Sequence, residues 1–174
     1  MKSAKAQMDT NKNLFEGLGC LRGREYDIEI DPEVKPVQLP PRQVPYKIKD
    51  KVKEKLNRVV DLRVIEPVHE PTEWVSQITT VLKKNGQARV CLDPRELNRP
   101  IKRQHYPMTV IEEVAVRIPG AKVFSKLDAT SGHWQLKLSE CSSKLTTFNT
   151  PWGRYKFLRM PFGISSTGKI GRKE

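Results

Sequence analysis

Apolar residues follow two different periods along the chain. A helical period comes first, because apolar positions separated by lysines recur every three or four residues at Ile48, Val52, Leu56 and Val59. Residues 74–82 and 88–92 are instead rich in β-branched side chains, which predicts two strands. The segment 83–87 between them contains Asn-Gly, a pair that accepts positive φ, so the two strands are expected to form a hairpin.

Other segments extend this pattern. An alternating run at 26–30 predicts a short strand, and the prolines that follow it keep the chain extended. Thr109 with Glu112 forms a plausible capping box for a short helix ending near Ile118. Further strands are predicted at 121–127, 134–138, 144–149 and 154–158. The expected fold class is α+β, with antiparallel hairpins and a few segregated helices.

Charge favours a polyanionic partner. The 174 residues carry a net charge of +12, and residues 121–174 hold ten Lys and Arg against three Asp and Glu. Nucleic acid fits this balance, although many basic surfaces bind nothing specific. The three cysteines and three histidines form no zinc pattern. No signal peptide or membrane-spanning run is present, so we expect a reducing cytoplasmic or nuclear location without a membrane.

Candidate chemistry concentrates in residues 124–135. Asp128 follows an apolar run and precedes a tight turn of small residues. A carboxylate there can bind a divalent cation while backbone N–H groups of the turn face an anion. The alternative is that Asp128 only forms the turn or caps a helix.

Several ordered motifs together resemble the reverse transcriptase domain of Gypsy-type (LTR) retrotransposon Pol polyproteins. The segments that carry the resemblance are 82–86, 89–98, 124–135, 147–153 and 157–166. Residues 15–20 also resemble the join between protease and polymerase in that family. The similarity covers roughly residues 14–166, and matching separations make it far more specific than any single motif.

The resemblance implies a right-hand polymerase fold that is incomplete in this chain. Fingers would span about 25–102 and 136–166, and the start of the palm about 103–135. Residues 1–24 would be a flexible lead-in, similar to a protease–polymerase linker, and residues 167–174 a divergent tail. The implied reaction is nucleotidyl transfer onto a primer with an RNA or DNA template, deoxynucleotides and Mg²⁺.

Roles for individual residues follow from the same resemblance. Asp128 and the carbonyl of Ala129 would hold metal, and Ser131 and Gly132 would offer backbone N–H groups to the triphosphate. Lys83 and Arg89, on either side of the hairpin, would hold phosphates, unless they are merely solvated.

The other implied residues line the nucleotide pocket. His133 stands where the family usually has a Tyr or Phe that blocks a ribose 2′-hydroxyl, so it is either a change in sugar discrimination or a tolerated substitution. Phe162 and Gly163 match the segment that lines the pocket, although Phe162 could equally be ordinary packing. Trp134 is expected to be structural.

The match ends after Ser166, and no aspartate follows Asp128. One carboxylate cannot hold two Mg²⁺ ions with near-octahedral oxygen shells. We therefore expect a polymerase fragment that is inactive by itself. The alternatives are a non-catalytic basic module that binds nucleic acid and a non-functional remnant of a retroelement. Nothing in the sequence indicates an oligomeric state.

Overall fold

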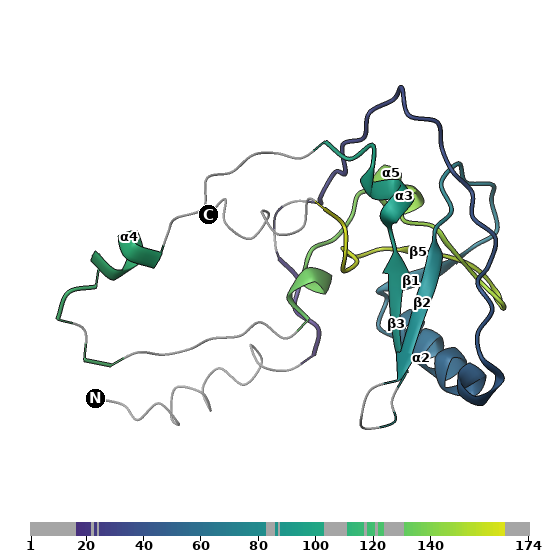
Figure 1. Cartoon of the computed structure of the whole chain (residues 1–174), viewed down its shortest axis with the longest axis horizontal. Coiled ribbons are helices and arrows are strands. Elements are labelled where there is room, and N and C mark those ends of the chain that lie inside the picture. The colour runs from purple at the N-terminus through teal and green to yellow at the C-terminus, as the bar shows by residue number, and fades with distance from the viewer. Residues whose placement is uncertain are drawn as a thin grey trace.

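A computed structural model describes residues 17–21, 23, 25–82, 86, 88–102, 111–116, 118–120, 122–123 and 131–165. Its elements, several of which are labelled in Figure 1, are η2 (Tyr46–Ile48), α2 (Lys49–Asp61), β1 (Ile65–Val68), β2 (Gln77–Leu82), β3 (Ala88–Asp93), α3 (Arg95–Asn98), α4 (Ile111–Val116), η3 (Gly132–Gln135), α5 (Glu140–Leu145), β4 (Phe148–Thr150) and β5 (Gly153–Phe157). The mixture of helices and antiparallel strands confirms the predicted α+β class.

Helix α2 is the amphipathic helix that the sequence predicts. Its apolar positions Val52, Leu56 and Val59 are buried, because residues three and four apart share one face. The helix ends at Asp61, and Arg63, two residues further on, has φ 51 and lies in the left-handed region. Arg63 N–H donates to Val60 O and Val64 N–H to Val59 O, a pairing that satisfies the last carbonyls of the helix.

The strands form two antiparallel sheets that meet at one bridge. Strands β2 and β3 pair as the predicted hairpin, with Val81 opposite Arg89, and Gly86 at its tip has φ 76. The second sheet has the order β1-β5-β4. Ser76, just before β2, bridges Phe148 in β4, so the hairpin is joined to the second sheet.

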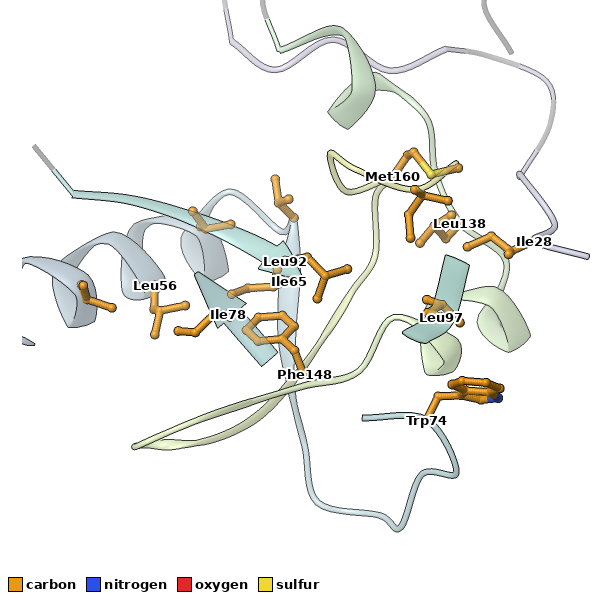
Figure 2. Packing of buried hydrophobic residues seen from close by; sticks show 14 of the residues in the cluster. Ile28, Leu56, Ile65, Trp74, Ile78, Leu92, Leu97, Leu138, Phe148 and Met160 are labelled. Carbon is orange, nitrogen blue, oxygen red and sulfur yellow. The ribbon is translucent and has the colours of Figure 1, made fainter. Parts of the chain in front are cut away.

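One hydrophobic cluster connects these layers. Leu56 of α2, Ile78 of β2 and Phe148 of β4 belong to this cluster and lie in the same part of Figure 2. Leu138 and Met160, at another part of the cluster, lie close together in the same view. The cluster also includes Ile28 and Ile164, so residues near both ends of the described chain share one core.

Helix α5 brings polar side chains into this core, and they are hydrogen-bonded. Ser142 Oγ accepts from Ile28 N–H at 2.8 Å, and Ser143 Oγ donates to Phe157 O at 2.6 Å. Thr146 Oγ1 donates to Ser143 O at 2.7 Å and accepts from Phe157 N–H at 3.1 Å. Buried hydroxyls of this kind stabilise a fold because their partners are satisfied.

An ion-pair network lies beside these hydroxyls. Lys156 of β5 is buried, and its Nζ is 3.0 Å from both Glu66 Oε1 and Glu140 Oε1. Burial lowers the pKa of Lys156, but the hydrogen bonds to the two glutamates outweigh burial and leave the pKa raised. The hydrogen bond from Lys156 in turn lowers the pKa of Glu140.

Several local predictions were wrong. Residues 26–30 make only isolated bridges, and residues 134–138 begin as the 3₁₀-helix η3. The segment predicted as a strand at 144–149 starts inside α5, because Ser139 caps that helix by accepting from Ser142 N–H. Strand β1 was missed, since it contains Pro67 and sits at a sheet edge where a missing N–H is tolerated.

Two further predictions concern segments that lie partly outside the described residues. The helix expected near 109–118 is present as α4, but its capping residue Thr109 lies outside the described residues. So does most of the strand expected at 121–127.

Candidate nucleotide-binding site

The short helix η3 positions the first group of predicted site residues. Ser131 precedes it with φ 52 and ψ 41, a left-handed conformation that costs a non-glycine residue about 1–2 kcal/mol. Trp134 N–H donates to Ser131 O at 2.8 Å, and Leu136 N–H donates to His133 O at 3.2 Å. The strained turn therefore presents Ser131, Gly132 and His133 in sequence at the start of one helical turn.

A second turn carries Phe162 and Gly163. Gly163 has φ 98, and a Cβ on it would come within 3.2 Å of Pro94 Cγ, so glycine is required by both conformation and space. The side-chain amide of Asn98 in α3 holds this turn in place through two hydrogen bonds. Its Nδ2 donates to Gly163 O at 2.9 Å, and its Oδ1 accepts from Ser165 N–H at 2.9 Å.

Aromatic rings join the two turns. The ring centroids of His133 and Phe162 are 4.4 Å apart with a tilt of 42°. Trp134 meets the same phenylalanine edge-on at 6.2 Å. His133 and Phe162, which the sequence places 29 positions apart, are thus in direct contact.

A cavity of about 860 Å³ connects these turns with the hairpin and α2. Arg89, Ser131, Trp134 and Phe162 all line it, whereas His133 contacts Phe162 without lining the cavity. Helix α2 contributes three cationic side chains and one glutamate to the wall: Lys51, Lys55, Arg58 and Glu54. The balance of charge favours an anionic ligand.

The hairpin that carries Arg89 is held against α2. Lys51 Nζ donates to Gly86 O at 3.0 Å, at the tip of the hairpin. At the other end of β3, the bidentate hydrogen bond from Arg95 lowers the pKa of Asp93 despite opposing burial. The hairpin is therefore tied to α2 at its tip, and a local ion pair lies at the end of β3.

Three predicted site residues lie outside the described residues: Lys83, Asp128 and Ala129. The family that the sequence resembles generally uses a divalent metal. Within the described ranges, no group of three or more His, Cys, Asp or Glu could hold a metal ion. The described part of the chain also contains no helix long and apolar enough to cross a membrane.

Sequence reasoning missed Asn98 and did not place Trp134 at the cavity. Asn98 lies between Leu97 and Arg99 in a four-residue helix, and no local pattern distinguishes it. Trp134, expected as a structural residue, lines the cavity. In both cases the partner lies in the distant turn at 162–165, which a single-segment pattern cannot identify.

Comparison with known proteins identifies the family. The family model described as "Reverse transcriptase (RNA-dependent DNA polymerase)" matches residues 81–168, half of the chain. The chain belongs to the reverse transcriptase family. The match contains the hairpin strand β3, η3 and the turn at 162–165.

Several relatives of this chain are retrotransposon polyproteins. The retrovirus-related Pol polyprotein from transposon gypsy of Drosophila melanogaster is 34% identical over 104 residues, which cover 60% of this chain and 10% of that protein. The resemblance to Gypsy-type Pol polyproteins is therefore confirmed. The chain spans about a tenth of the length of this curated relative.

Solved structures share the fold. The prototype foamy virus protease-reverse transcriptase has a TM-score of 0.77 at 21% identity, covering 92% of this chain and 22% of that one. The foamy viral protease-reverse transcriptase in complex with RNA/DNA hybrid has a TM-score of 0.69 at 18% identity, covering 93% and 22%. At these identities the likeness establishes the fold of part of a reverse transcriptase.

Proposed function

We propose that the chain forms the fingers and the start of the palm of a retrotransposon RNA-directed DNA polymerase. The fingers would span about 25–102 and 136–166, the palm would begin at about 103–135, and the cavity would receive a deoxynucleoside triphosphate. One observation carries this proposal: Arg89, Ser131 and Phe162, implied by family resemblance to meet a nucleotide, line one cavity although they come from three segments. The tail at 167–174 would lie outside the polymerase body.

Each residue has a role that suits its chemistry. Arg89 would grip phosphate oxygens with its planar guanidinium, and Lys83 would add a point charge. Backbone N–H groups of Ser131 and Gly132 would donate to the same anion, since small residues let the backbone approach it. Phe162 would face the sugar and base directly. His133, whose ring centroid is 4.4 Å from that of Phe162, and Gly163 would support this side of the nucleotide site from behind Phe162.

The two-metal centre of the family does not fit the residues of this chain. Asp128 and the Ala129 carbonyl would supply two oxygens, whereas each Mg²⁺ needs about six oxygen ligands. Residues 129–174 contain no aspartate that could complete the set. We therefore assign Asp128 and Ala129 to one metal and expect the 174-residue chain to bind a nucleotide without extending a primer.

Nucleic acid is the proposed macromolecular partner. The net charge is +12, and similar solved proteins carry dsDNA or an RNA/DNA hybrid. Basic side chains that release counterions from a phosphate backbone give an affinity that falls steeply with salt. Raising salt from about 50 to 200 mM should weaken template–primer binding tenfold or more.

The test is a titration of the purified chain with a deoxynucleoside triphosphate, comparing native protein with Arg89→Met. A lost charge-assisted hydrogen bond should weaken binding about tenfold or more. Arg99→Met is the matched control, because Arg99 is an exposed arginine paired with Glu96 on α3 and does not line the cavity. Equal affinity of native and Arg89→Met chains, or no binding by the folded native chain, would contradict the proposal.

A basic module without chemistry is the second candidate. The excess of ten basic over three acidic residues in 121–174 favours it. Salt-sensitive binding of template–primer with no binding of a deoxynucleotide would support this module over the nucleotide site. Primer extension that Asp128→Asn abolishes would instead show that the chain is active by itself.

A further inference from the structure

The segment Gly17–Leu21 packs against η3. Leu21 N–H donates to Gln135 O at 2.8 Å. Gly19 lies so close to Gln135 that a Cβ on the glycine would be 3.1 Å from Gln135 Cδ. Leu18 packs against the hydrophobic core, and Gly17 and Leu18 line the same cavity as Arg89 and Phe162.

Arg159 ties this segment to η3 with one guanidinium nitrogen. Its Nη1 donates to Gly19 O at 3.0 Å and to Trp134 O at 2.9 Å. The backbone of Arg159 also forms an isolated antiparallel β-bridge with Lys137, and Met160 N–H donates to Leu136 O at 2.9 Å. The end of η3 is therefore enclosed by the N-terminal segment on one side and residues 159–160 on the other.

Helix η3 needs external support because it is short and begins with a strained residue. A single 3₁₀ turn has poor hydrogen-bond geometry and little cooperativity. Its backbone bonds join Ser131 to Trp134 and His133 to Leu136. A planar guanidinium offers several donors in a fixed arrangement, so it can satisfy two carbonyls from different segments at once.

We propose that Arg159 and the segment Gly17–Leu21 form a brace that positions η3. The brace holds His133 and Trp134 against Phe162 and thereby sets the affinity and sugar preference of the cavity. Arg159 is a positioning residue, since it acts through the Trp134 carbonyl. This inference rests on the proposed nucleotide site.

Hydrogen exchange tests the brace without any nucleotide. In the full chain, Gly19→Val should push the segment away from Gln135, and Arg159→Met should release both carbonyls. Exchange of amides in 134–138 should rise at least tenfold in each variant, while amides of β2 (77–82) stay unchanged. Arg99→Met, which removes an exposed arginine outside the brace, is the control and should match the native chain.

The same variants test the effect on the site. Affinities for dATP and ATP should both fall about fivefold or more, and their ratio should move toward one, which a purely structural loss would not cause. The Gly19→Val/Arg159→Met double variant should weaken binding by less than the product of the single effects, because both act on one contact.

Distinct outcomes separate this inference from the proposed function. Unchanged exchange in 134–138, or an equal rise in β2, would overturn the brace. Loosened η3 amides with unchanged affinities and an unchanged dATP/ATP ratio would overturn its positioning role. If exchange behaves as expected but the folded native chain binds neither nucleotide, the proposed nucleotide site fails while the physical brace stands.

Discussion

The region around α5, β5 and β1 and the candidate site are held together in different ways. Around α5, buried hydroxyls and the Lys156 ion pairs join neighbouring elements through several contacts that support one another. At the site, each turn is held by a side chain from a distant segment. Arg159 reaches Gly19, 140 residues away, and Asn98 reaches Gly163, 65 residues away.

Because of this difference, we expect substitutions in the first region to change mainly the stability of the fold and substitutions at the site to change mainly its geometry. Substitutions around α5 remove buried groups from a shared core and should destabilise the whole fold. Substitutions at the tethers release a turn that is largely at the surface, so they should change binding more than stability.

The largest expected effect is at Phe148. This ring is 1% exposed and packs against Tyr155 and Phe157, with centroids 5.9 and 5.2 Å away. Phe148→Ala should lower the free energy of unfolding by about 3–5 kcal/mol. Phe162→Ala, where the ring is 40% exposed, should cost less than about 1 kcal/mol yet weaken nucleotide binding. Urea unfolding of both variants measures the contrast, and similar losses would contradict it.

A smaller loss is expected from a single buried hydroxyl. Thr146→Val keeps the shape of the side chain but leaves Phe157 N–H without its acceptor. The free energy of unfolding should fall by about 1–3 kcal/mol. The control is Thr80→Val on β2, a half-buried strand position that should tolerate valine within about 0.5 kcal/mol. Equal stability of the two variants in thermal unfolding would show that the α5 hydroxyls are dispensable.

The Asn98 tether should affect stability less and binding more. Asn98→Ala removes both hydrogen bonds to the turn and should cost about 1 kcal/mol in stability. Deoxynucleotide affinity should fall several-fold, since Phe162 is no longer held. Asn98→Asp keeps the acceptor for Ser165 N–H but places a carboxylate beside Gly163 O, so it should not restore affinity. Asn57→Ala on the exposed face of α2 is the control.

The smallest effect is a pH dependence at the end of β3. The hydrogen bond and charge of Arg95 lower the pKa of Asp93, so the carboxylate stabilises the folded state above the ordinary aspartate range. That contribution is lost as the pH falls through the lowered pKa. Asp93→Asn should therefore unfold slightly more easily near pH 7 and show a shallower loss of stability in acid. Urea midpoints between about pH 2 and 7 measure both slopes, and parallel slopes would contradict the assignment.

The local sequence was sufficient to predict elements that depend only on residues within one segment. The spacing of Val52, Leu56 and Val59 determined α2, and the strand-rich runs around Asn85-Gly86 determined the hairpin. The ordered motifs also determined the family and pointed to Arg89, Ser131 and Phe162, because they preserve both residue types and separations.

Only the tertiary structure decided those features that depend on contacts between residues far apart in the sequence. Pro67 lies in a strand because β1 pairs with β5 at a sheet edge, where the missing N–H of proline is tolerated. Residues 140–145 form a helix whose buried hydroxyls are hydrogen-bonded to the backbone of β5 and of Ile28. The roles of Asn98 and Arg159 depend on carbonyls 65 and 140 residues away, which no local pattern contains. Sequence period reports which face of an element is apolar, whereas a hydrogen bond across the fold exists only once both partners have been brought together.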